Sequence, residues 1–292
     1  MSIKHSFKQS IYYLTRHNKD GSFATQRARV QRLNQIGTDL IQAGFKLRHI
    51  RGLKQKHIYF LVNHWKQSGL SPGTIKNRLS DLRWACEKFG RPEVVPNNSV
   101  LQVEKRQLIP DSDKSMTLTS EHLTKVSSPY IRLSLQLQAL FGLRREEAMK
   151  IKVFQADKGH HLELQGSWAK NGRPRTVPIQ TQAQRALLDD IKTFLKKPHL
   201  SLIPENKKYS EHLKVYEKQV QRAGIYHAHG LRHAYAQQCY LEFTGFPCPV
   251  KGGPKRKTLT PDQAKHDKAA RLEVSRHLGH NRLGVTDQYL SR

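Results

Sequence analysis

The stretch HLGHNRLGVTDQY, residues 277–289, places a tyrosine nine residues after a histidine near the end of the chain. In one unbroken helix this separation is about two and a half turns, which would direct His280 and Tyr289 to opposite sides. We expect Asn281 and Gly284 to break the helix, so that the tyrosine turns back toward the histidine. A single tyrosine near the end of a chain is normally a packing residue. Whether Tyr289 has a chemical role must therefore be inferred from the other segments.

A second informative segment is FGLRREEA, residues 141–148. Residues 131–143, which include the first three residues of this segment, are apolar enough for a buried helix, and Arg144 follows directly. Glu147 can share a helical face with Arg144 and orient its guanidinium toward a ligand, with Glu146 as the other candidate for this carboxylate. A surface ion pair is the plain alternative.

Two strand-like runs follow at residues 161–168 and 175–179, separated by the hairpin turn signal Asn171-Gly172. Lys170 would then stand at a hairpin tip, from which an ammonium can reach a phosphate or donate a proton to a leaving oxygen. Basic hairpin tips are frequent on protein surfaces, so this feature has little meaning in isolation.

The segment HAHGLRHAYA, residues 227–236, begins another helix. His229, Arg232 and His233 fall on one face of that helix near its amino-terminal end, where the helix dipole favours an anion. Zinc is the alternative, because three histidines lie within seven residues. Against zinc, Arg232 would stand among the ligands, and no cysteine or carboxylate completes a plausible set.

Composition indicates the kind of ligand. The chain has 51 Lys and Arg against 23 Asp and Glu, a formal charge of +28 and a pI of about 10.2, as in nucleic-acid binders. A generally basic protein of ribosomal or chromatin type is the alternative. Together, the basic side chains can bind and protonate phosphate oxygens while a tyrosine hydroxyl attacks phosphorus. The segments therefore predict metal-free phosphoryl transfer on a polyanion, and the polyanion we expect is DNA.

The organisation along the chain predicts a mainly α fold with a small β-sheet, in two domains. Apolar residues recur at helical spacing within 30–41 and 58–65, and a third helix begins with Ser71 as N-cap and Pro72. We expect a helical domain at 1–95, a linker at 96–116 and an α+β domain at 117–292. In the second domain, further helices are expected at 183–195, 209–223, 229–243 and after a Thr260 cap.

Jointly, the four segments resemble the tyrosine recombinase (phage integrase) family in order, spacing and flanking sequence. The matching features are Gly-Leu-Arg followed by Glu147, Lys170 eight residues before Pro178, His-x-Leu-Arg-His from His229, and Leu-Gly-His before Tyr289. The resemblance covers residues from about 118 to the end. The helical first half is similar to that family's core-binding domain by pattern only.

The resemblance implies that Tyr289 attacks the scissile phosphate to form a 3′-phosphotyrosyl intermediate. By the same resemblance, Arg144 and Arg232 would bind the non-bridging oxygens of the phosphate, and His280 would add a hydrogen bond. Lys170 and His229 would carry out the proton transfers. Glu147 and His233 would support these groups, and neither ATP nor a divalent metal is implied. A type IB topoisomerase, in which lysine usually stands at the His229 position, and a catalytically inactive DNA-binding protein are the alternatives.

Further expectations concern partners and location. We expect binding to double-stranded DNA, a homotetramer on DNA, accessory DNA-bending proteins, no membrane segment, and a cytoplasmic protein of bacterial or phage origin. The enlarged connection at 244–272 is either a DNA-contacting or a solvated loop. Three residues follow Tyr289, so the C-terminal helix that many relatives exchange is expected to be missing. The residues expected to contact DNA are Lys76, Arg78, Arg83, Arg173, Arg175, Lys255, Arg256 and Lys257.

Overall fold

The computed structural model describes residues 2–110, 112–169, 172–280 and 282–292, with only the backbone of Leu283. The chain forms two compact units, which meet in sequence at Gln107 and Leu108. Each unit has its own buried apolar core. Residues of the expected linker belong to the first of these cores, because Leu101 and Val103 are buried in it.

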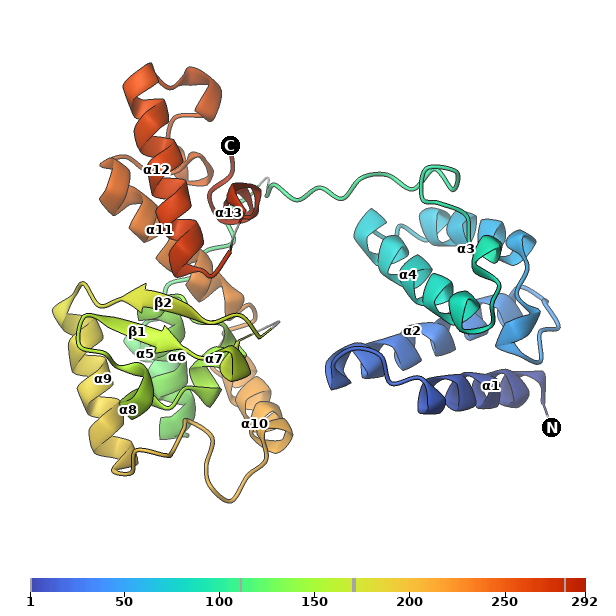
Figure 1. Cartoon of the computed structure of the whole chain (residues 1–292), viewed down its shortest axis with the longest axis horizontal. Coiled ribbons are helices and arrows are strands. Elements are labelled where there is room, and N and C mark those ends of the chain that lie inside the picture. Colours follow the sequence, from blue (N-terminus) through green and yellow to red (C-terminus); the bar gives the residue numbers. More distant parts are fainter. Residues whose placement is uncertain (1, 111, 170–171, 281) are drawn as a thin grey trace. The chain divides into compact units, whose positions relative to one another are not determined.

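The first unit is a bundle of helices, drawn in blue to cyan in Figure 1. Its elements are α1 (Ile3–His17), α2 (Phe23–Gln42), α3 (Gln55–Gln67), α4 (Pro72–Lys88) and the short 3₁₀ turns η1 (Ile50–Gly52) and η2 (Pro92–Val94). Helices α2 to α4 coincide with the apolar periodicities of the sequence, and the Ser71 hydroxyl accepts the Thr74 N–H as the predicted N-cap. Helix α1 is not among the predicted helices, although Phe7, Ile11 and Leu14 repeat at helical spacing and are buried.

Two of the residues expected to contact DNA, Arg78 and Arg83, lie on α4 and bind other parts of the first unit. The Arg78 guanidinium lies 3.0 Å from the Asp39 carboxylate and over the ring of Trp65, and its side chain is partly buried. Arg83 donates to the Pro96 carbonyl at 2.6 Å. Both guanidinium groups already have protein acceptors, which argues against the predicted DNA contacts at these two positions.

The second unit, green to red in Figure 1, joins helices to one two-stranded sheet. This confirms the predicted mainly α fold with a small sheet. Its helices are α5 (Ser120–Thr124), α6 (Pro129–Phe141), α7 (Arg145–Lys150), α8 (Val153–Ala156), α9 (Gln182–Leu195), α10 (Tyr209–Arg222), α11 (His229–Thr244), α12 (Pro261–His277) and α13 (Leu283–Leu290), with 3₁₀ turns η3 (Gly166–Trp168), η5 (Pro249–Lys251) and η6 (Arg256–Thr258). The Thr260 hydroxyl caps α12 as predicted.

The sheet is the predicted antiparallel hairpin, with shorter strands. Strands β1 (His161–Leu164) and β2 (Arg175–Pro178) pair with Leu162 opposite Val177, and both of these side chains are buried. The predicted first strand ends early because the 3₁₀ turn η3 follows it. Within η3, Gly166 lies close to the backbone carbonyl of Gly172. A Cβ at Gly166 would lie 2.4 Å from that oxygen. Asn171 of the predicted turn lies outside the described residues.

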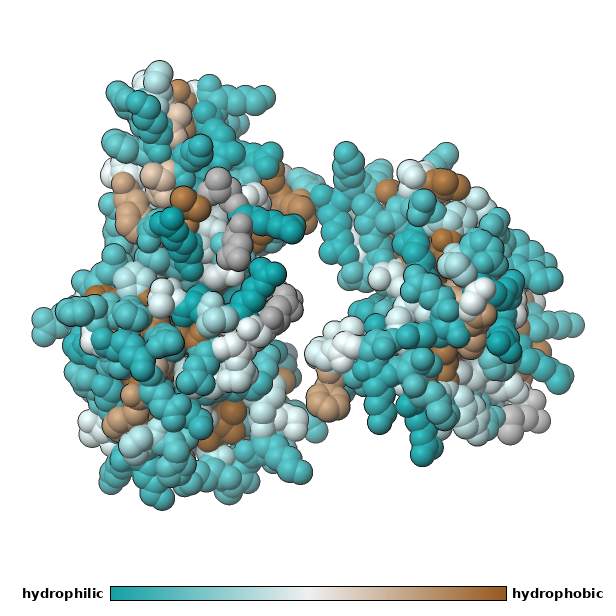
Figure 2. Space-filling view, viewed as in Figure 1, coloured by the Kyte–Doolittle hydropathy of each residue, from teal (hydrophilic) through white to brown (hydrophobic). Residues whose placement is uncertain are grey.

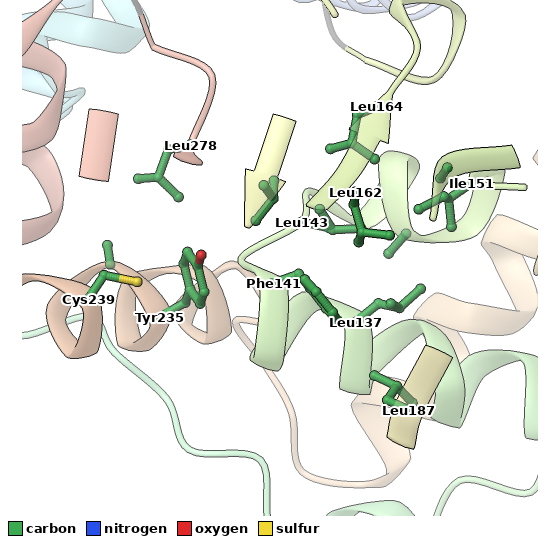
Figure 3. Close-up of a cluster of buried hydrophobic side chains, with 14 of the residues drawn as sticks. Leu137, Phe141, Leu143, Ile151, Leu162, Leu164, Leu187, Tyr235, Cys239 and Leu278 are labelled. Carbon is green, nitrogen blue, oxygen red and sulfur yellow. The ribbon is translucent and has the colours of Figure 1, made fainter. Parts of the chain in front are cut away.

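The core of the second unit brings α6, α11 and the hairpin together, as Figure 3 shows. Helix α6 ends at Gly142, whose φ of +59° favours glycine. A Cβ there would lie 2.4 Å from Cδ1 of Tyr235, so the end of α6 approaches α11 closely. This packing brings the residues after α6 next to the first turns of α11.

On the face shown in Figure 2, hydrophilic residues predominate over both units. Among the described residues, no helix is long and apolar enough to cross a membrane. Cys86, Cys239 and Cys248 are free and buried.

Candidate active site

The reversal at the end of the chain brings Tyr289 back to His280. Helix α12 ends at His277, and Gly279, with a φ of +65°, takes the left-handed conformation that turns the chain. Helix α13 then returns Tyr289, whose Oη lies 3.4 Å from Nε2 of His280. Gly284 lies within α13, so the prediction that it breaks the helix is wrong, and Asn281 lies outside the described residues.

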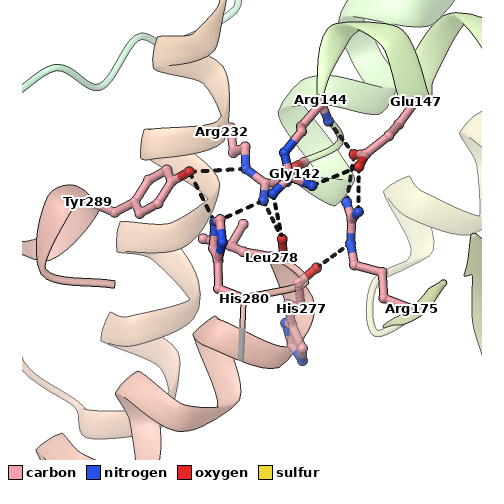
Figure 4. A network of polar contacts seen from close by, with 9 residues as sticks. All are labelled: Gly142, Arg144, Glu147, Arg175, Arg232, His277, Leu278, His280 and Tyr289. Carbon is pink, nitrogen blue, oxygen red and sulfur yellow. Dashed lines mark hydrogen bonds and ion pairs between the residues drawn. The ribbon is translucent and has the colours of Figure 1, made fainter. Parts of the chain in front are cut away.

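Arg232 connects these residues to the end of α6. Its side chain is 1% exposed, and its Nη1 and Nη2 donate to the carbonyl oxygens of Gly142 and Leu278. Its Nε lies 3.4 Å from Tyr289 Oη, and its Nη2 lies 3.4 Å from His280 Nε2. Figure 4 shows the three side chains meeting around the tyrosine oxygen. Separations of 3.4 Å are at the long end for hydrogen bonds.

The proton positions around Tyr289 follow from donor capacity. A guanidinium can only donate, so Nε2 of His280 accepts from Arg232 and its ring proton sits on Nδ1. The hydroxyl of Tyr289 accepts from Arg232 Nε, and its own proton competes with the Arg232 Nη2 proton for the single lone pair of Nε2. Burial, and then the positive charge of Arg232, lower the pKa of His280 to about 3. The imidazole is therefore neutral near pH 7.

Glu147 holds two further arginines beside this centre. Its carboxylate is 1% exposed and accepts from Arg144 Nη1 at 2.7 Å and from Arg175 Nη1 and Nη2 at 2.6 and 2.7 Å. Burial alone would raise its pKa, but the hydrogen bond and charge of Arg175, and then the charge of Arg144, lower it to about 2. Of the two carboxylates considered, Glu146 instead pairs with Lys150 at 2.5 Å on the surface.

The carboxyl end of α12 gathers the arginines from different elements. The last carbonyls of a helix lack intrahelical donors and carry partial negative charge. Arg175 Nε donates to the His277 carbonyl at 3.0 Å, and Arg144 Nη2 joins Arg232 at the Leu278 carbonyl, at 3.4 Å. One helix end thus positions guanidinium groups from β2, α11 and the turn before α7.

Two histidines of α11 flank the tyrosine ring. The ring centroids of His233 and Tyr289 are 4.6 Å apart, and those of His229 and Tyr289 are 6.0 Å apart. Burial, and then the charge of His229, lower the pKa of His233 to about 4. The zinc alternative gains no support, because within the described ranges no three His, Cys, Asp or Glu side chains are placed to hold a metal.

The structure therefore brings most of the expected site residues into one place. They are Arg144, Glu147, His229, Arg232, His233, His280 and Tyr289. Lys170, also expected there, lies outside the described residues. Arg175 was expected on a DNA-contacting surface, but its side chain is 5% exposed and bound to Glu147, which corrects that assignment. The strand alternation could have shown this, because Arg175 shares its face with the buried Val177.

The remaining expected DNA contacts differ in exposure. Arg173, Lys255 and Lys257 are exposed, and Lys76 is half-buried. Arg256 is partly exposed, with its guanidinium 3.5 Å from Asp267. Because a phosphate contact needs an accessible cation, the exposed three fit the expectation best.

The free energy of unfolding should decrease at acidic pH, as the Glu147 carboxylate becomes protonated. Its pKa falls from an ordinary 4.5 to about 2 in the folded protein, so its ionised form stabilises the native state above pH 4.5. We expect the stability difference between the wild type and Glu147→Gln to be full above that pH and to shrink as the pH falls toward 2. Denaturant unfolding at a series of pH values measures the difference, and a constant difference between about pH 5 and pH 3 would contradict this role.

Comparison with known proteins identifies the family. The phage integrase N-terminal family matches residues 5–95, and the integrase family matches residues 102–238. The chain belongs to the tyrosine recombinase family. A sequence search of curated proteins finds no match.

Solved structures of family members share this fold. XerH site-specific recombinase bound to palindromic difH substrate is similar with a TM-score of 0.60 at 16% identity, over 98% of this chain and 81% of that one. A lambda integrase dimer bound to a COC′ core site gives 0.59 at 15%, over 97% and 76%. The Tn1549 transposon integrase in complex with circular intermediate DNA gives 0.51 at 14%, over 98% and 95%. At identities of 14–16%, the structural similarity establishes the fold of this chain and nothing beyond the fold.

Proposed function

We propose that this tyrosine recombinase is a site-specific DNA recombinase or integrase that cleaves and rejoins strands through a 3′-phosphotyrosine at Tyr289. The observation that carries the proposal is the position of Tyr289 Oη, 3.4 Å from both Arg232 Nε and His280 Nε2. A protonated phenol is a weak nucleophile, so its attack on phosphorus needs activation. Dense positive charge around it favours the phenolate and stabilises the charge of the transition state.

In the proposed cleavage step, Tyr289 Oη forms a bond to phosphorus and the bond from phosphorus to the 5′ oxygen breaks. Lys170 and His229 carry the proton transfers, in which one group takes the phenol proton and the other protonates the leaving 5′ oxygen, and His280 adds a hydrogen bond. Arg144 and Arg232 bind the non-bridging oxygens. Because the phosphotyrosine is itself a diester, a 5′-hydroxyl of another strand can reverse the step and rejoin the DNA.

The proposed substrate is double-stranded DNA. A net charge of +28, with exposed Arg173, Lys255 and Lys257, suits a phosphate backbone. The similar structures are complexes with DNA, and a lambda integrase tetramer bound to a Holliday junction gives a TM-score of 0.51. We propose a homotetramer on DNA, with the core-binding domain in the first unit and the catalytic domain in the second. Accessory DNA-bending proteins and a bacterial or phage origin are part of the same proposal.

The test begins by finding the DNA site. The protein is immunoprecipitated with its bound DNA, and the sequenced site is built into a suicide substrate nicked near the cleavage position. The proposal predicts a covalent adduct, and peptide mapping should place it on Tyr289. Failure to form an adduct on any cognate site would favour a DNA-binding protein without this chemistry.

A second assay separates recombination from topoisomerase activity. Exchange of strands between two cognate duplexes is expected from a recombinase. Adduct formation accompanied only by relaxation of supercoiled plasmid would contradict the proposal and support the type IB topoisomerase alternative.

A further inference from the structure

The segment 113–116, at the start of the second unit, packs on the helix that carries three of the site residues. Met116 N donates to the Gly230 carbonyl at 3.0 Å. Gly230 also has no room for a side chain, because a Cβ would lie 2.7 Å from the Lys114 carbonyl and 2.8 Å from Met116 Cβ. This segment is therefore fixed against the first turn of α11, beside His229 and Arg232.

One buried side chain links this segment to the backbone of Tyr289. Gln237, on α11, is 5% exposed, and its Nε2 donates to Asp113 Oδ1 at 2.8 Å and to the Tyr289 carbonyl at 3.2 Å. Both partners are acceptors, so the amide can have only this orientation. Its Oε1 is buried with no partner among the described residues. The amide nitrogen of Gln237 thus makes two hydrogen bonds, while its amide oxygen makes none among the described residues. This arrangement points to a role for Gln237 in positioning the two groups that accept from it.

Asp113 is itself held in place. Lys251 Nζ lies 2.7 Å from its Oδ2, and the Ser115 N–H and hydroxyl donate to it at 2.8 and 2.7 Å. These bonds with Lys251, Gln237 and Ser115 outweigh partial burial and lower the pKa of Asp113 well below its ordinary value. The carboxylate is therefore charged at neutral pH and fixes the donating amide of Gln237.

The geometry points to a clamp, formed by Asp113 and Gln237, that positions Tyr289 for attack. Tyr289 is near the end of α13, a helix of eight residues whose last carbonyls lack intrahelical donors. Such a short helix owes its placement to contacts with its surroundings. The clamp supplies one of these contacts at the nucleophile itself. This inference rests on the proposed function of Tyr289, and it makes Asp113 and Gln237 positioning residues.

The experiment compares four variants of the full-length protein. Gln237→Met removes both donated bonds, and Asp113→Leu removes the acceptor from a less buried position. Asp113→Asn keeps one acceptor oxygen for Gln237 but loses the ion pair with Lys251, so its effect should be smaller than that of Asp113→Leu. Gln238→Met is the matched control, because Gln238 is the next residue on the same helix but is exposed and bonds only to Glu242 among the contacts described.

Two measurements are made on each variant. Hydrogen exchange of the 283–290 amides should become about tenfold faster in Gln237→Met and Asp113→Leu, while exchange of the β1–β2 hairpin stays unchanged. The single-turnover rate of adduct formation on the suicide substrate should fall about tenfold with DNA affinity unchanged. A 5′-bridging phosphorothioate, which improves the leaving group, should not rescue the rate, because the nucleophile is what is misplaced. Gln238→Met should resemble the wild type in both measurements, and Asp113→Asn should lie between the wild type and Asp113→Leu.

The outcomes separate this inference from the proposed function. Unchanged exchange at 283–290 in both Gln237→Met and Asp113→Leu would overturn the clamp, as would faster exchange spread equally over the hairpin. If the wild type forms no adduct, the recombinase proposal fails while the exchange measurement still decides whether the clamp holds Tyr289. If the wild type forms an adduct and both variants match its rate, the clamp fails and the recombinase proposal stands.

Discussion

Tyr289→Phe is expected to abolish covalent adduct formation while the protein still folds and binds DNA. The phenyl ring keeps the contact with His233, at 4.6 Å between centroids, but the attacking oxygen is gone. Loss of a nucleophile costs on the order of 10⁶-fold in rate, which places the variant below detection. Gel analysis of the nicked suicide substrate measures the adduct, and a filter or anisotropy assay measures DNA affinity.

A matched control for this variant is Tyr216→Phe. Tyr216 is buried between α6 and α10, where its hydroxyl accepts a hydrogen bond from Gln138 at 3.0 Å. Removing this hydroxyl should cost about 1 kcal/mol of stability and leave the adduct rate unchanged. Adduct formation by Tyr289→Phe at more than a trace would show that another residue is the nucleophile.

Glu147→Gln is expected to cause a large loss of stability. The carboxylate compensates Arg144 and Arg175, whose side chains are 23% and 5% exposed. A glutamine in its place leaves both guanidinium groups facing a neutral amide whose nitrogen can only repel them. Breaking a buried ion pair in this way costs about 3 kcal/mol or more, measured as the free energy of unfolding in denaturant.

Glu146→Gln, the same change at the preceding residue, is the matched control for Glu147→Gln. Glu146 is exposed and pairs with Lys150 along the surface of α7, so Glu146→Gln should change the free energy of unfolding by less than about 0.5 kcal/mol. Equal effects of the two substitutions would show that the buried network does not stabilise the native state. Glu147→Gln should also slow adduct formation, because Arg144 loses the partner that orients it.

Local pattern was sufficient for most helices and for the hairpin. The Ser71 cap, the Thr260 cap and the apolar periodicities of α2 to α4 are properties of neighbouring residues, so they can be recognised without the fold. The same holds for the motifs around Arg144, Arg232 and Tyr289. Local pattern was insufficient at the chain reversal, where Gly279 rather than Gly284 turns the chain. Either glycine allows a left-handed residue, and the packing of α12 and α13 determines which one adopts it.

By itself, the sequence determined the element types, the strongly basic charge and the order of the segments that carry the site. Only the tertiary structure decided that Arg175 shares the Glu147 carboxylate, that the end of α12 gathers three arginines, and that Gln237 reaches Tyr289. These contacts join residues separated by 28 to 134 positions in sequence. Propensity and periodicity describe interactions within a few residues, whereas such distant pairs are selected by how buried surfaces fit together.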